Sequence, residues 1–223
     1  MKSLVVLGLP RSMSSLIHRK FGEIVEGIKV PDRAIWHDGD PWNHIHTEYP
    51  KMKKVFANSK MYQYRKHEKV MNDYKNGFLV KNVCQPKYAF EYFNKSKDFN
   101  VLVIQRPLAD VVYALYARKW FWPINILGLD SDLEEHQTLE NLCEAVIKIQ
   151  IEYLEKIENR YLLSYNNLLF DSTLLYRKLK SMGYSCKEES HIDSVFENKR
   201  KIILNIRKTP LYEKIEGIIE KLR

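Results

Sequence analysis

The sequence LGLPRSMSSL, residues Leu7–Leu16, joins a short apolar run to a segment with helical periodicity. Residues 4–7 have the composition of a buried strand, and apolar residues recur every three or four positions up to Ile28. This pattern predicts a strand, a tight turn and a helix over Met13–Gly27. The free backbone N–H groups and the dipole at the amino end of a helix attract anions. The stretch therefore predicts an anion-binding turn.

Polar side chains within the turn suit the same purpose. Ser12, Ser14 and Ser15 carry hydroxyl donors, and Arg11 carries a planar cation that matches phosphate or sulfate oxygens. The alternative is that the serines only cap the helix, which is a common use of serine at a helix start. Both interpretations remain open on these residues alone.

The turn differs from the Walker loop of nucleotide hydrolases, G-x-x-x-x-G-K-[ST]. Counted from Gly8, the positions of the Gly-Lys pair hold Met13 and Ser14. The third predicted strand ends in Gln105 and Arg106, whereas such enzymes place there an aspartate that holds Mg²⁺. ATP hydrolysis is therefore a poor fit to the sequence.

Four apolar runs have the length and composition of buried strands: Leu4–Leu7, Gly77–Val83, Asn100–Pro107 and Arg160–Tyr165. Helical segments alternate with them, the longest over Thr138–Glu158. This alternation predicts an α/β fold of three layers, a mainly parallel β-sheet flanked by helices, in a single domain over residues 1–223. Ligands of such sheets bind beyond the carboxyl ends of the strands, where Arg11 and Arg106 are expected.

The composition is that of an ordinary globular protein, with 45% apolar and 29% charged residues. The formal net charge is +8, and residues 51–75 alone contain eight Lys or Arg. This excess is either a solvated helix face or a surface that attracts an anionic partner. No nucleic-acid-binding motif accompanies it, so nucleic acid is not an expected partner.

Three cysteines, Cys84, Cys143 and Cys186, form neither a disulfide framework nor a metal-binding spacing, which indicates a reducing compartment. The first apolar run is shorter than the core of a signal peptide, and no stretch approaches the length of a membrane span. The sequence therefore predicts a soluble, cytoplasmic protein.

Four segments, in the same order, resemble the PAPS-dependent sulfotransferases, where PAPS is 3′-phosphoadenosine 5′-phosphosulfate. GLPRSMSSL (8–16) is similar to their 5′-phosphosulfate loop, and VLVIQRPLADVVYALYARKW (101–120) is similar to their Arg-x-Pro-x-Asp-Val motif with its helix. FLVKNV (78–83) and YLLSYNNLLFDSTLLYRKLKSMGY (161–184) resemble the second and the late strand. The resemblance implies a P-loop-like sulfotransferase architecture, PAPS as donor, 3′-phosphoadenosine 5′-phosphate (PAP) as product, and no metal.

The same resemblance implies that the turn cradles the phosphosulfate and that Arg106 holds the 3′-phosphate. Met13 departs from the family pattern because it replaces the loop glycine. Ala114 departs because it replaces a serine that holds the 3′-phosphate, and three nearby residues could substitute for it: Tyr113, Tyr116 and Arg118. The implied donor-binding set is Pro10, Arg11, Ser12, Met13, Ser14, Ser15, Arg106 and Ala114.

Sulfuryl transfer needs charge stabilisation on the leaving phosphate and a base for the acceptor proton. Arg11 suits the first task, and Lys81 at the end of the second strand is a further candidate, unless it is simply turned to solvent. The candidates for the base come from a long polar segment and are His37, Glu48 and His44. The His44-x-His46 spacing in that segment matches no standard metal site.

The resemblance implies a hydroxyl or amine acceptor. Small alcohols, lipids, glycans and peptide tyrosine all remain open as acceptors, and the basic segment suggests the hypothesis of an acidic glycan. Two other hypotheses remain: a kinase-like P-loop nucleotide enzyme, and a non-catalytic module that binds a nucleotide or an anionic glycan. The following aromatic residues either stack on an acceptor ring or form an apolar lid: Trp36, Trp42, Trp120, Phe121 and Trp122. The following basic residues either reach the 3′-phosphate or are solvated: Lys199, Arg200, Lys201 and Arg207. The sequence leaves the oligomeric state open.

Overall fold

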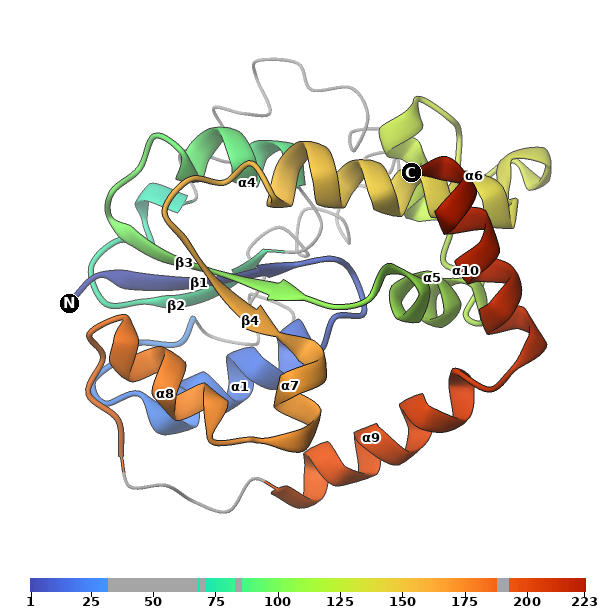
Figure 1. Cartoon of the computed structure of the whole chain (residues 1–223). Coiled ribbons are helices and arrows are strands. Elements are labelled where there is room, and N and C mark those ends of the chain that lie inside the picture. The colour runs from blue at the N-terminus through green and yellow to red at the C-terminus, as the bar shows by residue number, and fades with distance from the viewer. Residues whose placement is uncertain (32–67, 69–70, 83–85, 188–192) are drawn as a thin grey trace.

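A four-stranded parallel sheet organises the chain, with the strand order β2-β1-β3-β4 (Figure 1). The computed structural model describes residues 1–31, 68, 71–82, 86–187 and 193–223. The strands are β1 (Ser3–Gly8), β2 (Leu79–Asn82), β3 (Phe99–Gln105) and β4 (Arg160–Ser164). In register, Val5 of β1 lies between Val80 of β2 and Val101 of β3.

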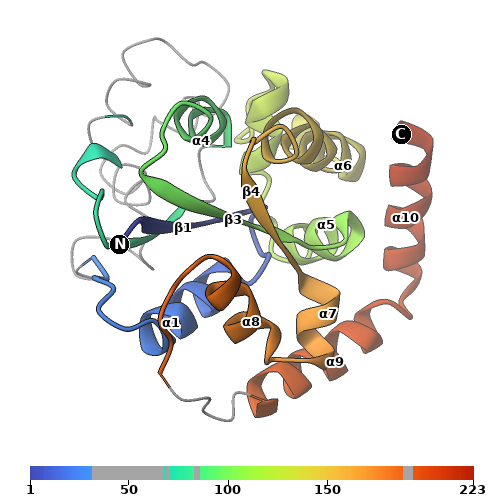
Figure 2. The same cartoon turned by 60° about the vertical axis from the view of Figure 1, so that its left-hand side comes forward.

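Helices cover both faces of the sheet, because alternate strand residues enter two separate apolar cores. Val5 and Leu7 point to one core, and Leu4 and Val6 point to the other. The first core is closed by α4 (Pro86–Phe93), α5 (Leu108–Tyr116), α6 (Leu139–Lys148) and α10 (Pro210–Leu222). The second is closed by α1 (Ser14–Ile24), α7 (Tyr165–Phe170), α8 (Leu174–Ser181) and α9 (Asp193–Ile206). Figure 2 shows the two helical layers on either side of the sheet.

The predicted α/β class, with a parallel sheet flanked by helices, is thereby confirmed, while two helix boundaries differ. The predicted helix Met13–Gly27 ends at Ile24, because Val25 turns extended and bridges to Cys186. The predicted helix Thr138–Glu158 starts as expected, since Thr138 Oγ1 accepts the Asn141 N–H at 3.1 Å. It then widens into a π-helix, η5, over Ile149–Leu154, where hydrogen bonds span five residues.

Two short 3₁₀ segments, η3 (Trp122–Leu127) and η4 (Glu134–His136), link α5 to α6. Within the part of the chain that the structure describes, no helix is both long and apolar enough to cross a membrane.

The strand order fixes where a ligand would bind. From β1 the chain moves to β2 on one side, and it then crosses to β3 on the other side of β1. In open α/β sheets such a reversal opens a crevice at the carboxyl ends of the two strands. The segments after β1 and β3 are the predicted anion-binding turn and Arg106, so the topology brings these two together.

Candidate anion-binding site

The turn after β1 is held from inside by Ser12. Its hydroxyl donates to Leu9 O at 2.5 Å, its backbone N–H donates to the same oxygen at 3.2 Å, and the residue is fully buried. Gly8 makes room for this hydroxyl, because a Cβ at Gly8 would lie 2.5 Å from Ser12 Oγ. The Ser12 hydroxyl therefore donates its hydrogen bond within the turn, whereas the sulfotransferase resemblance implies that it contacts the phosphosulfate.

Two non-glycine residues of the turn, Arg11 and Met13, adopt left-handed backbone conformations with φ of 65° and 64°. Such conformations cost about 1–3 kcal/mol each and concentrate at functional sites. Met13 takes the place of the loop glycine with a glycine-like conformation, and its side chain packs against the second core. The left-handed conformation at position 13 is one that glycine adopts readily.

Met13 is also the N-cap residue of α1, and its thioether provides no oxygen to cap the helix. The first intrahelical bond runs from Ile17 N to Met13 O at 3.0 Å. The first turn of α1 contains no acidic residue. No carboxylate in the first turn therefore offsets the positive end of the helix dipole. This positive end favours binding of an external anion.

Arg106, directly after β3, reaches the turn. Its Nη1 donates a hydrogen bond to the backbone oxygen of Arg11, and its guanidinium lies 4.5 Å from the centre of the Tyr165 ring. Its side chain is only 8% exposed. Within the described residues its buried Nε has no hydrogen-bond acceptor, and the nearby Asp110 Oδ2 lies 3.7 Å away. A buried donor without an acceptor is costly, so this Nε marks a place where an acceptor is wanted.

Asp110, in the first turn of α5, is a buried carboxylate that the carboxyl-terminal part of the chain neutralises. Arg207 Nε donates to Oδ1 at 3.0 Å and Arg207 Nη2 donates to Oδ2 at 2.8 Å. Tyr212 adds a hydroxyl bond to Oδ1 at 2.9 Å, and Arg207 also donates to Asn166 Oδ1 at 2.8 Å. The bond to Asp110 raises the pKa of Arg207 above its usual value. Arg207 is one of the four basic residues that the sequence left as either 3′-phosphate ligands or solvated side chains. It instead donates its hydrogen bonds to Asp110 and Asn166 of the protein.

Arg11 and Arg118 both lie against Trp120, with guanidinium carbons 5.3 and 5.8 Å from the centre of its ring. Trp120 is 42% exposed, whereas Phe121 is buried and packs edge-on against Tyr116 at 5.8 Å. Burial lowers the pKa of Arg11, and the positive charges of Arg118 and Arg106 lower it further. Like charges gathered in this way are stabilised by an anion between them.

Lys81, at the end of β2, donates to Ser15 Oγ at 2.9 Å and is only 3% exposed. The structure thus brings this candidate to the start of α1, rather than turning it to solvent. Nearby, the buried His18 ring forms a hydrogen bond through Nε2 to Leu79 O at 3.1 Å. This hydrogen bond joins α1 to β2.

The predicted residues Pro10–Ser15, Lys81 and Arg106 therefore converge at the carboxyl ends of β1, β2 and β3. Ala114 lies on α5 one turn after Asp110 and is partly buried. His37, His44 and Glu48 lie outside the described residues, as do Trp36, Trp42 and most of the basic segment 51–75. In the described ranges, no group of three or more His, Cys, Asp or Glu side chains could hold a metal ion.

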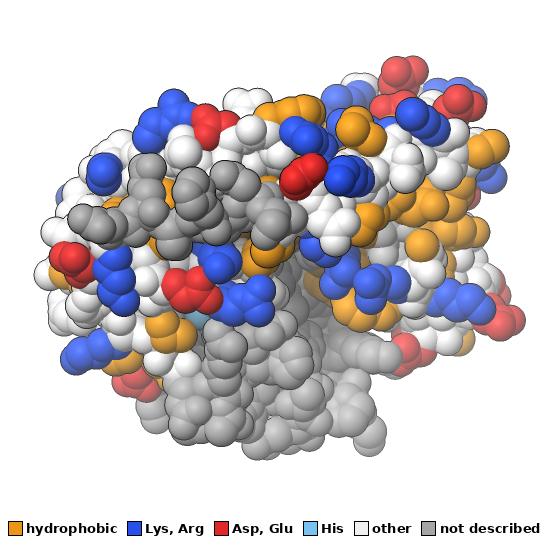
Figure 3. Space-filling model, turned by 90° about the horizontal axis from the view of Figure 1, so that it is seen from below, with side chains coloured by type: hydrophobic (Ala, Val, Ile, Leu, Met, Phe, Trp, Pro, Cys, Tyr) orange, Lys and Arg blue, Asp and Glu red, His pale blue; other side chains and the backbone are white. Residues whose placement is uncertain are grey.

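Seen from below, Lys and Arg side chains gather near the centre of the face in Figure 3, with apolar side chains beside them on the side of α10. Clustered positive charge of this kind raises the local concentration of anions.

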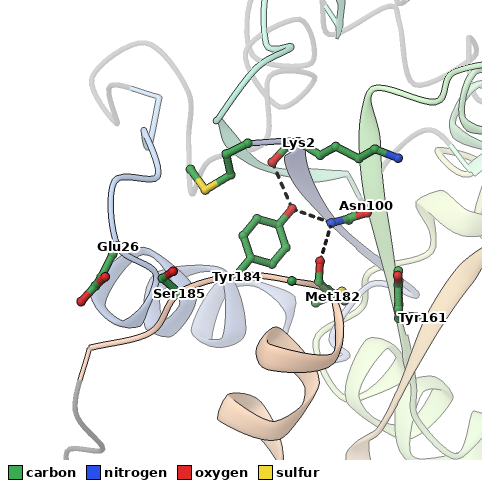
Figure 4. Close-up of a pocket in the computed structure, with 9 residues that line it drawn as sticks. Lys2, Glu26, Asn100, Tyr161, Met182, Tyr184 and Ser185 are labelled. Atoms are coloured by element: carbon green, nitrogen blue, oxygen red, sulfur yellow. Dashed lines mark hydrogen bonds between the residues drawn. The ribbon is translucent and has the colours of Figure 1, made fainter.

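A separate depression of about 510 Å³ lies at the opposite, amino-terminal edge of the sheet (Figure 4). Its central group is Tyr184, whose hydroxyl donates to Lys2 O at 3.1 Å and accepts from Asn100 at 3.1 Å. Asn100 also donates to Met182 O at 3.2 Å. These polar groups bond one another and fasten the segment after α8 to the sheet, so the depression carries no evident chemistry.

Comparison with protein-family models, with curated proteins and with solved structures gives no match to this chain.

The sequence assigned no role in the site to several residues that shape it: Asp110, Tyr165 and Tyr212. Asp110 was visible as the acidic residue of the Arg-x-Pro-x-Asp-Val segment, four positions after Arg106 and hence on the same side of a helix start. Tyr165 and Tyr212 carried no comparable signal, because their roles arise from contacts between segments distant in sequence.

Proposed function

We propose that this chain is a sulfotransferase of P-loop-like architecture that moves a sulfuryl group from PAPS to a hydroxyl or amine acceptor. The observation that carries the proposal is the buried Arg106 guanidinium, which reaches the anion-binding turn with an Nε that has no acceptor within the described residues. Arginine suits phosphate and sulfate oxygens, because its planar donors bind two oxygens at once.

The donor set fits the phosphate and sulfate groups of such a nucleotide. The amino end of α1 and the turn after β1 would face the phosphosulfate, and Arg106 and Arg11 would neutralise its charge. Lys81, which donates to Ser15 Oγ, would stabilise the oxygen that bridges phosphate and sulfur. The Ala114 side chain offers no hydrogen bond, so contacts to the 3′-phosphate fall to Arg106 and its neighbours.

In the proposed reaction the acceptor oxygen or nitrogen forms a bond to sulfur while the bond from sulfur to the phosphate oxygen breaks. The leaving phosphate keeps the electron pair of the broken bond, and the acceptor proton passes to a base. His37, Glu48 and His44 remain the predicted bases. The chain contributes position and positive charge, as in related phosphoryl transfer.

An acidic glycan remains the favoured acceptor. Arg118 is exposed beside Trp120 at the edge of the site, and this combination suits an acceptor with its own negative charge. Cys143 and Cys186 are free thiols, which supports a reducing compartment such as the cytoplasm.

A non-catalytic module that binds the same anion is the second candidate, and Ala114 favours it because a ligand contact of the family is missing there. The kinase-like hypothesis has less support, since β3 ends at Gln105 and is followed by Arg106, where a metal-binding aspartate is expected.

The test is to incubate the protein with PAPS and a panel of hydroxyl and amine acceptors, acidic glycans included, and to measure PAP release by chromatography. Acceptor-dependent release that is lost in Arg106→Ala is the expected result. The matched control is Arg177→Ala, which removes an exposed arginine paired with Asp171 on the surface. Release that is equal in all three proteins would contradict the proposal, and PAP binding without turnover on any acceptor would favour the non-catalytic module.

A further inference from the structure

Arg207, between α9 and α10, saturates a carboxylate that lies beside Arg106. Its fork covers both oxygens of Asp110 at 3.0 and 2.8 Å, and the Tyr212 hydroxyl adds a third bond at 2.9 Å. Asp110 is only 1% exposed, so its carboxylate is shielded from bulk solvent. A two-point bond from arginine to carboxylate is among the stronger hydrogen-bonded pairs in proteins.

Arg106 is the other cation within 4.0 Å of Asp110 among the described residues. Its Nε lies 3.7 Å from Oδ2, which is too long for a hydrogen bond. Asp110 therefore draws Arg106 only weakly as long as Arg207 holds both carboxylate oxygens. Without Arg207, the buried carboxylate would lose two of its three bonds, and Arg106 would be the nearby donor able to replace them.

We infer that Arg207 is a positioning residue of the anion-binding site: by saturating Asp110 it keeps the Arg106 guanidinium available to a ligand. This inference rests on the proposed function. Removal of Arg207 lets Asp110 draw Arg106 inward by about 1 Å to hydrogen-bond distance and neutralise its charge. The site then binds anionic nucleotides more weakly, although neither Arg207 nor Asp110 touches the ligand.

Calorimetric titration with PAP tests this on the wild type, Arg207→Met and the double variant Arg207→Met/Asp110→Asn. The single variant is expected to bind at least about tenfold more weakly, which corresponds to the loss of one charge-assisted hydrogen bond. The double variant is expected to recover to within about threefold of the wild type, because the amide no longer attracts Arg106 as a carboxylate does. A purely structural role of Arg207 predicts that the double variant binds no better than the single one.

Two controls complete the design. Arg207→Lys retains a cation near Asp110 but cannot cover both carboxylate oxygens, so it should bind PAP more tightly than Arg207→Met and more weakly than the wild type. Arg177→Met removes another arginine paired with an aspartate and should bind as the wild type does. Thermal unfolding establishes that each variant is folded at the titration temperature. If Arg207→Met does not fold, Asp110→Asn alone decides: binding at least as tight as the wild type supports the inference, and weaker binding overturns it.

The PAP titration distinguishes failure of the proposed function from failure of the role of Arg207. A wild type that does not bind PAP refutes the proposed function, and the role of Arg207 falls with it. A wild type that binds PAP, with Arg207→Met equally tight or the double variant unrecovered, overturns only the role of Arg207.

Discussion

Gly8→Ala tests the packing of the turn that carries the site. A methyl group on Gly8 would lie 2.5 Å from Ser12 Oγ, about 1 Å inside ordinary contact. Ser12 is fully buried and its hydroxyl donates to Leu9 O, so relief of the clash requires that bond to break. An unsatisfied buried polar group costs about 1–3 kcal/mol, and overpacking costs about as much. We therefore expect Gly8→Ala to lower the free energy of unfolding by about 2–4 kcal/mol.

Urea unfolding followed by circular dichroism measures this loss. Ser12→Ala removes the clashing oxygen, so in that background Gly8→Ala should cost at most about 1 kcal/mol, because the next atoms, at 3.4 and 3.5 Å, are at ordinary van der Waals distance. Gly217→Ala is the matched control: it lies in α10 with nothing within 4 Å of the new methyl group, and it should gain up to about 1 kcal/mol. An equal cost of Gly8→Ala in both backgrounds would refute the described geometry of the turn.

Three further predictions concern other contacts. Tyr212→Phe removes one hydrogen bond to buried Asp110 and should lower the free energy of unfolding by about 1–2 kcal/mol in the same urea assay; unchanged stability would show that this bond does not contribute. Burial raises the pKa of Tyr184 to about 12, so its neutral form is favoured in the folded state. Its contribution is complete below the ordinary tyrosine pKa of about 10 and is lost as pH rises toward 12, by up to about 1.4 kcal/mol per pH unit. Tyr184→Phe should flatten this decline in urea titrations across that range, and an unaltered slope would contradict the assignment. Lys81→Met should slow sulfuryl transfer at least about tenfold, as measured by PAP release, and should also weaken PAP binding in calorimetry, because the bridging oxygen stays on the leaving phosphate of PAP. Equal rates would remove Lys81 from the mechanism.

The sheet was predictable from sequence because β1 and β2 are buried along their whole length and β3 along most of it, so that they appear as mainly apolar runs. β4 is more exposed, with Leu162 at the surface, and was predicted from its apolar composition. The apolar run Leu4–Leu7 identifies β1 without information on its neighbouring strands. The turn and helix that follow it place the amino end of α1 at the carboxyl end of β1. The early end of α1 was not predictable, since it depends on Val25 pairing with Cys186 from a distant segment. The π-helical widening after Lys148 likewise leaves no mark in the apolar periodicity.

The site was predictable only in part. Arg11 and Arg106 follow β1 and β3 directly, so parallel topology alone places them together. The contact of Arg207 with Asp110 joins positions 97 residues apart and could not be inferred from spacing. Ser12 was assigned to the ligand from its place in the motif, but its inward hydroxyl depends on backbone geometry that sequence does not specify.

Calorimetric titration of the metal-free protein with PAP tests the central claim most directly, with ATP in the presence and absence of Mg²⁺ as the comparison. The account predicts micromolar binding of PAP that weakens at least about tenfold in Arg106→Ala and is unchanged in Arg177→Ala. No binding of PAP, or binding of ATP only with Mg²⁺, would contradict it.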